Sequence, residues 1–367
     1  MKIAFINEGI YEYATGAPEA NGGLERDQWL LSRALAAHGW TAVVGVAGSL
    51  KPTERKTIDG VEYVGLNRSR NVFAWRQFLS SERPNWLFWE GAGHLLGPVV
   101  ELASFAHIRT IFHTAFDTDV YPRYALAYRR RWWPLYAWGL ARTSKIFVQH
   151  KGQLSALPHR WQAKASVLPK VCDLLKGLSE SVHITPHVER QKYVAWVAML
   201  RQPKRPDVLV EIARKAPNIS FVVCGGTTSH RSPPGYGERI TEEFRKLPNI
   251  SYRGQVGPQE AAQVIADAAV LLSTSDEEGF PNTFIQAWAS GTPVVSLKVD
   301  PDRIIERMRL GVLSGSIQKA IGDINALLNS VEERERIASR ARRYIADVHS
   351  EEAVTATFER ALRRVGS

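Results

Sequence analysis

The sequence of 367 residues contains only two cysteines, Cys172 and Cys224, which lie in apolar surroundings without a paired spacing. A disulfide scaffold and a zinc site are therefore not expected, and a reducing cytoplasm fits this composition. No window approaches about 18 uninterrupted apolar residues, and the apolar run at the N-terminus is too short for a signal peptide. We expect a cytoplasmic protein whose only membrane contact would be peripheral, at the inner face.

The Gly-x-Gly-x-x-Gly fingerprint is also absent, which argues against a nicotinamide or flavin enzyme. The net charge is +10, and it is concentrated in residues 1–177, where 22 Lys and Arg stand against 14 Asp and Glu. Such an excess indicates an anionic partner. Because no nucleic-acid-binding motif of the usual kinds is present, a membrane surface or an anionic, lipid-linked acceptor is favoured over nucleic acid.

Short apolar runs alternate with helical patterns through both halves of the chain. The expected strands lie at 3–6, 43–46, 86–89, 110–113 and 146–148 and, in a second series, at 194–197, 221–224, 270–272 and 293–297. This alternation predicts an α/β protein with two Rossmann-like parallel sheets. Periodicity is lost around residues 173–190, so we expect an N-terminal domain over 1–180, a second domain over 181–348, and a final helix within 349–367.

The stretch 270–299 carries the strongest signal for a site. An apolar strand runs into the loop Glu277-Glu278-Gly279-Phe280-Pro281, and a helix begins at Asn282 and Thr283 and stops at Gly291. Loops at the carboxyl ends of parallel strands are where open α/β sheets bind ligands, and amides at a helix start suit a phosphate. Together with the Glu278 carboxylate and Gln286 on the helix, this predicts a sugar–phosphate site.

This stretch resembles the second half of the family 4 glycosyltransferases, which are retaining nucleotide-sugar enzymes of GT-B fold. Their pattern of Glu, seven residues, Glu, followed by Gly-x-Pro-Val-Val, is matched here by Glu278, Gly291, Pro293, Val294 and Val295. The second acidic position is occupied by Gln286, which departs from the pattern. An amide can also hydrogen-bond the nucleotide ribose, the task of that family residue.

The resemblance continues at three other places. The basic loop after the strand at 194–197 places Lys204 at the position of a family lysine, with Arg201 as the substitute for an arginine. Gly22 and Gly23 open the first helix like a family Gly-Gly pair that borders the donor diphosphate. His113 follows its strand where the family often has a histidine near the transferred sugar.

The resemblance implies two domains that face each other across a cleft, with the nucleotide sugar held by the second. It also implies that the C-terminal helix, within 349–367, crosses back onto the first domain. Glu278 is expected to hold sugar hydroxyls, Gln286 the ribose, and Lys204 with Arg201 the leaving diphosphate. The remaining donor contacts are expected from Gly22, Gly23, Gly279, Phe280, Pro281, Asn282 and Thr283, and His113 is expected to position the sugar. The resemblance further implies retention at the anomeric carbon, no metal and no cofactor, and a role in polysaccharide or glycolipid synthesis.

The acceptor is expected on the first domain, as a glycan, free or lipid-linked. Asp117 and Asp119 spell the metal-binding Asp-x-Asp of another glycosyltransferase fold, but the rest of that pattern is absent, so acceptor hydroxyls are their expected partners. A cationic and aromatic segment follows, with Arg129, Arg130, Arg131, Trp132 and Trp133. It is typical either of a membrane interface or of a helix whose aromatics fill the core.

Two other functions remain open from the sequence. A nucleotide-sugar epimerase uses the same fold and the same kind of donor site. A catalytically idle protein that only binds would explain Gln286, although Glu278 and Lys204 argue against it.

Overall fold

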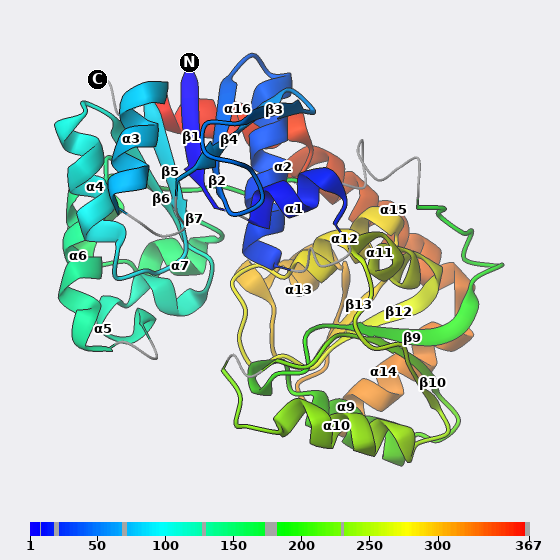
Figure 1. Cartoon of the computed structure of the whole chain (residues 1–367). Coiled ribbons are helices and arrows are strands. Elements are labelled where there is room, and N and C mark those ends of the chain that lie inside the picture. The colour runs from blue at the N-terminus through cyan, green and yellow to red at the C-terminus, as the bar shows by residue number, and fades with distance from the viewer. Residues whose placement is uncertain are drawn as a thin grey trace. The chain divides into compact units, whose positions relative to one another are not determined.

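A computed structural model describes the chain in seven stretches: residues 1–7, 9–17, 22–67, 72–126, 130–172, 182–228 and 231–363 (Figure 1). It divides into two compact parts, which we call unit 1 (Met1–Val171 with His349–Ser367) and unit 2 (Cys172–Val348). The expected boundary between residues 180 and 181 lies outside the described residues.

Unit 1 contains an eight-stranded sheet in the order β3-β4-β2-β1-β5-β6-β7-β8. Only the β3/β4 pair is antiparallel; the other neighbours run parallel. The strands are β1 (Lys2–Ile6), β2 (Thr41–Ala47), β3 (Arg55–Ile58), β4 (Val61–Leu66), β5 (Trp86–Glu90), β6 (Arg109–His113), β7 (Lys145–Val148) and β8 (Ala165–Val167).

Helices cover both faces of this sheet, which is why its central strands are apolar throughout. On β1, Ile3 and Phe5 pack with α2 and α16, whereas Ala4 packs on the opposite face with α3 and α4. The helices and 3₁₀ turns of unit 1 are α1 (Gly9–Thr15), α2 (Gly23–Ala37), α3 (Val72–Glu82), α4 (Leu96–Phe105), η1 (Asp117–Val120), α5 (Pro122–Ala125), η2 (Arg130–Trp132), α6 (Trp133–Arg142), α7 (Lys151–Ala156), α8 (His159–Gln162) and α16 (Glu351–Arg363).

The last helix, α16, belongs to unit 1 although 177 residues of unit 2 precede it in the chain. Phe358 on α16 is fully buried and its ring lies 5.3 Å from that of Phe147 and 5.6 Å from that of Trp40. The indole N–H of Trp40 donates to Glu359 Oε1 at 3.0 Å. The end of the sequence thus completes the core of its first domain.

Unit 2 contains a six-stranded, fully parallel sheet in the order β11-β10-β9-β12-β13-β14. The strands are β9 (Gln191–Val197), β10 (Ser220–Cys224), β11 (Ile250–Tyr252), β12 (Ala268–Ser273), β13 (Val294–Ser296) and β14 (Gly311–Leu313). The strand order reverses direction between β9 and β12, so the chain crosses to opposite sides of β9.

Helices again pack on both faces of the unit 2 sheet. Ala195 and Leu271 face α11, α12 and α15, whereas Val194 and Val270 face α9, α10 and α14. These helices and turns are η4 (Gln202–Lys204), α9 (Pro206–Lys215), α10 (Tyr236–Arg245), α11 (Pro258–Asp267), α12 (Asn282–Ser290), η5 (Pro301–Arg303), α13 (Ile304–Met308), α14 (Ile317–Asn329) and α15 (Val331–Val348). Two parallel α/β sheets are thus present, which confirms the predicted fold class.

Candidate functional site

The reversal of strand order in unit 2 brings two loops together. In open α/β sheets such a switch point is where ligands bind, beyond the carboxyl ends of the strands. Here β9 pairs with β12, with Leu271 opposite Ala195. The loop after β9 carries Arg201 and Lys204, and the loop after β12 carries Glu278.

Lys204 and Glu278 are 74 residues apart in sequence and in direct contact in the structure. The Lys204 ammonium donates to Glu278 Oε1, and their side chains are 17% and 11% exposed. The Ser275 hydroxyl donates to the same oxygen at 2.9 Å. Burial raises the pKa of Glu278, but Lys204, Ser275 and nearby Arg201 outweigh it and hold the pKa below its ordinary value. The carboxylate is therefore ionised at neutral pH.

Arg201 adds a second cation beside this pair. Burial lowers its pKa, while the charge of Glu278 acts in the opposite direction. Its Nε is buried and has no hydrogen-bond partner within the described residues. A guanidinium with an unused buried donor fits an anion that is supplied from outside the protein.

The start of α12 forms the other side of this site. Its N-cap residue is Pro281, which has no side-chain group that could accept from the first-turn amides of Asn282 and Thr283. The helix is held by aromatic packing, because the Phe280 and Phe284 rings lie 6.2 and 5.5 Å from that of Trp288. The helix dipole favours an anion at this end of α12, which begins four residues after Glu278.

Gly279, Phe280 and Pro281 are buried, and Gln286 on the same helix is also buried. Among the described residues, the Gln286 amide makes no hydrogen bond in the structure. Its capacity as donor and acceptor is thus unused within the part of the chain that the structure describes. Gly291 ends α12 in the left-handed region, at φ 79°, where a Cβ would lie 2.9 Å from that of Ala338.

Two further loops of unit 2 meet at the carboxyl ends of β10 and β11. The Gly225 N–H donates to the Gly254 carbonyl at 2.7 Å, and a Cβ at Gly225 would lie 1.8 Å from the Ala198 carbonyl oxygen. Beside them is a cavity of about 440 Å³ lined in part by Thr227, Tyr252 and Gln255.

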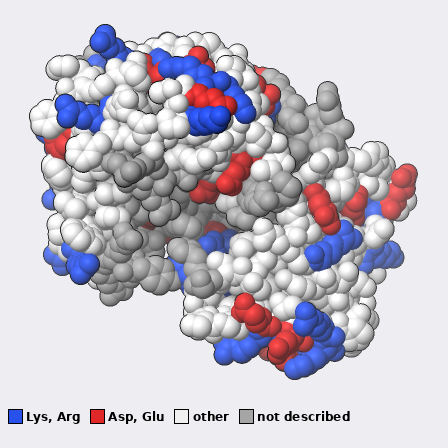
Figure 2. Space-filling model, viewed as in Figure 1, with Lys and Arg blue, Asp and Glu red and all other residues white. Residues whose placement is uncertain are grey.

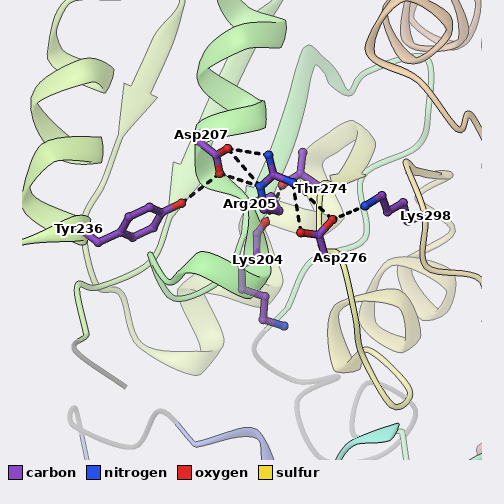
Figure 3. Close-up of polar contacts among 7 residues, drawn as sticks. All are labelled: Lys204, Arg205, Asp207, Tyr236, Thr274, Asp276 and Lys298. Carbon is purple, nitrogen blue, oxygen red and sulfur yellow. Dashed lines mark hydrogen bonds and ion pairs between the residues drawn. The ribbon is translucent and has the colours of Figure 1, made fainter. Parts of the chain in front are cut away.

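A network of charged residues that sequence reasoning missed lies next to Lys204 (Figure 3). Arg205 donates to Asp207 at 2.8 Å and to Asp276 at 3.1 Å. Lys298 donates to Asp276 at 2.6 Å, and the Tyr236 hydroxyl donates to Asp207 at 3.0 Å. The sequence showed only a basic loop here, since nothing in its local pattern pairs Arg205 with an acid 71 residues away.

In unit 1, His113 ends β6 directly opposite Glu90, which ends β5. The His113 Nδ1 lies 3.2 Å from Glu90 Oε1, and both side chains are buried. Burial lowers the pKa of His113 to about 3 and raises the pKa of Glu90 well above its ordinary value. The imidazole is therefore neutral at physiological pH and suits hydrogen bonding rather than charge stabilisation.

Gly22 and Gly23 stand at the start of α2, as the Gly-Gly pattern predicts for a helix opening. A Cβ at Gly22 would lie 1.7 Å from Glu25 Oε2. The absence of a side chain therefore allows the Glu25 carboxylate to fold back over the helix start.

The structure separates Asp117 from Asp119. Asp119 is only 2% exposed, and its Oδ2 accepts from the Ala115 and Phe116 amides at 2.7 and 3.1 Å. Asp119 therefore holds its own loop rather than facing an acceptor. Asp117 is accessible, and its Oδ1 accepts from Gln153 Nε2 at 2.8 Å and lies 2.8 Å from His150 Nε2.

The aromatic segment that follows has both buried and exposed aromatic side chains. Tyr136 on α6 is fully buried, and its hydroxyl donates to the Asp119 carbonyl at 2.8 Å. Trp132 and Trp138 are 39% and 41% exposed, and the Arg131 guanidinium lies 5.4 Å from the Trp132 ring centroid. Trp133 is half-buried under the guanidinium of Arg123. Arg129 and the side chain of Arg130 lie outside the described residues.

Charge is mixed on the face of the molecule drawn in Figure 2. Lysine and arginine side chains lie next to aspartate and glutamate at several places, and no broad patch of one sign is visible among the described residues of that face. Within the described chain, no helix has the length and apolarity needed to cross a bilayer. The same residues contain no cluster of three or more His, Cys, Asp or Glu side chains placed to hold a metal ion.

Comparison with solved structures shows that the two α/β units form a GT-B fold. Over 100% of this chain, the structure is similar to sucrose-phosphate synthase from Thermosynechococcus elongatus, with a TM-score of 0.77, 17% identity and 99% of that chain covered. Over 99% of this chain and 100% of the other, it is similar to HepE from Anabaena in complex with UDP and glucose, with a TM-score of 0.71 and 14% identity.

The sequence comparison then specifies the group. Residues 191–330 match the family described as glycosyl transferases group 1. D-inositol 3-phosphate glycosyltransferase of Mycolicibacterium smegmatis is 27% identical over 180 residues, which is 47% of this chain and 41% of that protein. The chain thus matches less than half the length of this relative. The resemblance to a group 1 glycosyltransferase of GT-B fold is confirmed, and the narrower assignment to family 4 stays a prediction.

Proposed function

We propose that this protein is a retaining glycosyltransferase that moves a sugar from a nucleotide-diphosphate sugar to an acceptor hydroxyl. The observation that carries the proposal is the buried contact between Lys204 and Glu278 at the switch point of the unit 2 sheet. Arg201 and the α12 start lie beside this contact. A site with two cations, a helix start and one carboxylate matches a ligand that is anionic at the diphosphate and hydroxylated at the sugar.

Lys204 and Arg201 would stabilise the charge that develops on the diphosphate as the glycosidic bond breaks. For this, the Lys204 ammonium exchanges Glu278 for a phosphate oxygen. Glu278 is then left to accept hydrogen bonds from sugar hydroxyls, which ionised carboxylates do strongly. Gln286 would bind the ribose through its unused amide. With these groups as the charge stabilisers, the proposed reaction needs no metal.

The sugar would be transferred on the face of the anomeric carbon that the diphosphate leaves, with the leaving phosphate accepting the acceptor's proton. We assign no protein nucleophile. Neutral His113 would hydrogen-bond the transferred sugar, and Gly22 and Gly23 would border the diphosphate. The acceptor is proposed to be a glycan, free or lipid-linked, bound by unit 1.

The names of two relatives support glycosyl transfer, and one solved complex supports a nucleotide-sugar donor. The relative from Mycolicibacterium smegmatis and one from Corynebacterium aurimucosum, 31% identical over 29% of this chain and 27% of that protein, are both D-inositol 3-phosphate glycosyltransferases. The Anabaena protein was crystallised with UDP-glucose, with a TM-score of 0.74 at 15% identity, over 99% of this chain and 100% of that one. UDP is therefore the first nucleotide to try.

The test is a thermal-shift panel of UDP, GDP, ADP, dTDP and CDP. A ligand at 100 times its Kd stabilises the native state by about 2.7 kcal/mol, which raises the melting midpoint by roughly 5–10 °C for a unit of this size. We expect one of the five to do so for the wild type and not for Lys204→Ala. Lys215→Ala is the matched control, because Lys215 is an exposed lysine of unit 2 paired with Glu211.

A normal response in Lys204→Ala would remove the diphosphate role of Lys204, and no response to any nucleotide would contradict the proposed donor site. Incubation of the enzyme with the matching nucleotide sugar alone then separates transfer from epimerisation. An epimerase would convert the donor to its epimer without an acceptor, whereas the proposed transferase would not.

A further inference from the structure

Arg205 occupies a backbone conformation that is unfavourable for its residue type. It precedes α9 at φ 51° and ψ 51°, in the left-handed region. There the Cβ crowds the following carbonyl, which costs free energy for every residue except glycine. At Arg205, the ion pairs of the side chain help to offset this cost.

The side chain makes ion pairs in two directions (Figure 3). On the same loop it binds Asp207 through Nε and Nη2, and across the sheet switch point it binds both oxygens of Asp276 at 3.4 and 3.1 Å. Against the effect of burial, Arg205 and Tyr236 hold the pKa of Asp207 below its ordinary value, and Lys298 and Arg205 do the same for Asp276. Both carboxylates are thus charged partners at neutral pH.

The two loops joined by Arg205 are the loops of the candidate site. They are also joined by one backbone bond, in which the Asp276 N–H donates to the Pro203 carbonyl at 2.9 Å, and by one side-chain bond, in which the Thr274 hydroxyl donates to the Lys204 carbonyl at 2.7 Å. In Figure 3 the Lys204 side chain points away from the Arg205 network. The adjacent residues therefore bind different carboxylates: Arg205 binds Asp276, and Lys204 binds Glu278.

We propose that Arg205 is a positioning residue: by clasping Asp276 it fixes the backbone of Lys204 against the Glu278 loop. This inference rests on the proposed function, which supplies the identity of the ligand as a nucleoside diphosphate or its sugar. When the Lys204 ammonium leaves Glu278 for a phosphate oxygen, its backbone must stay in place for the exchange to be favourable. The Arg205–Asp276 ion pair, which we call the clasp, does not touch the ligand but holds the Lys204 backbone in the position needed for binding.

The decisive variant is Arg205→Gly, which removes the clasp and relieves the backbone strain at once. Arg309→Gly is its matched control, because Arg309 is an exposed arginine of unit 2 at φ 54° and ψ 51°, outside both loops. The probe is UDP, measured by isothermal titration calorimetry, together with urea unfolding. We expect about tenfold weaker UDP binding in Arg205→Gly, unchanged binding in Arg309→Gly, and urea midpoints close to wild type in both.

A double-mutant cycle with Lys204→Ala and Arg205→Gly shows whether Arg205 positions Lys204 or only stabilises the fold. Lys204→Ala should weaken UDP binding by about thirtyfold in the wild type but only about threefold in the Arg205→Gly background. Equal losses in both backgrounds would overturn the proposal. If Arg205→Gly lowers the urea midpoint, Asp276→Asn decides, since it removes the charge that Arg205 binds without any backbone change and must reproduce the tenfold loss. Asp276 also pairs with Lys298, so Lys298→Ala is the control and must leave UDP binding unchanged.

A ligand-free measurement keeps the clasp testable even if UDP does not bind. Hydrogen exchange of the Asp276 amide reports its bond to the Pro203 carbonyl, and we expect about tenfold faster exchange in Arg205→Gly and Asp276→Asn. If the wild type does not bind UDP but the Asp276 amide exchanges faster in the variants, the proposed donor site is contradicted. The positioning role of Arg205 is then still supported. Unchanged exchange and unchanged UDP affinity in the variants would overturn the clasp.

Discussion

Replacing Glu278 with Gln is expected to raise the affinity for the nucleoside diphosphate and to lower the turnover of the nucleotide sugar. The side chain is 11% exposed and in contact with Lys204. In the free protein, Glu278 therefore pairs with the Lys204 ammonium, which a bound diphosphate would need. The negative charge of Glu278 also repels the diphosphate. With Gln, both effects disappear while the side-chain shape is retained.

The magnitude follows from Coulomb's law. A unit charge about 6 Å from a phosphate oxygen, at an effective dielectric constant of about 20, contributes roughly 3 kcal/mol. Salt and the residual exposure of the side chain reduce this to about 1–1.5 kcal/mol, which corresponds to roughly tenfold tighter binding of the nucleoside diphosphate. Turnover of the nucleotide sugar should fall by about two orders of magnitude, because charge-assisted bonds to sugar hydroxyls are worth about 1.5–3 kcal/mol.

Isothermal titration calorimetry with the diphosphate selected by the thermal-shift panel, and release of the diphosphate from its sugar, measure the two quantities. Glu277→Gln is the matched control, because Glu277 carries the same charge one residue away but its side chain is 40% exposed and pairs with Arg231. Its effect should be well under half as large, since solvent screens exposed charges. Weaker diphosphate binding in Glu278→Gln would refute the reasoning.

The remaining predictions concern stability and the unit 1 surface. Arg334→Ala should lower the free energy of unfolding by at least about 2 kcal/mol in urea titrations, because this 1% exposed arginine donates to the terminal carbonyls of α14; a change below about 0.5 kcal/mol would contradict this. Phe358→Ala should cost about 3–5 kcal/mol in the same assay, and a smaller loss would show that α16 is not part of the unit 1 core. Burial raises the pKa of Asp119 to about 7, above about 3.9 in the unfolded chain, so its contribution to stability is full below pH 4 and is lost as the pH rises through 7. Asp119→Asn should flatten that part of the pH profile, and an unchanged profile would exclude Asp119 as its source. Trp132→Ser with Arg131→Ser should reduce sedimentation with anionic phosphatidylglycerol vesicles several-fold if this surface contacts membrane, with neutral phosphatidylcholine vesicles as the control.

Much of the fold could be predicted because parallel strands covered on both faces leave a local signature. The run at β2 and the helix stop at Gly291 depend on burial and backbone conformation over a few neighbouring residues. Glu278 and Lys204 could be singled out because each follows an apolar strand in a loop that begins a helix. The structure brings these two residues into contact, which no pattern within either segment specifies.

Burial of polar side chains was less accessible from the sequence. Asp117 and Asp119 look equivalent in the sequence, yet only Asp119 turns inward to accept from two amides. The surroundings of the individual aromatic residues on α6 could not be predicted from the sequence either. A helix that lies on a sheet buries one side and exposes the other, so Tyr136 and Trp138 have opposite surroundings.

The sequence by itself determined the two α/β sheets, the loops that follow their strands and the residue types of the candidate site. Those features depend on local periodicity and on turn chemistry. Only the tertiary structure decided that β9 and β12 are neighbours, that Lys204 contacts Glu278, and that Arg205 reaches Asp276. These contacts join segments more than 70 residues apart, and their formation depends on the order in which strands pair, which the pattern within a single strand does not encode.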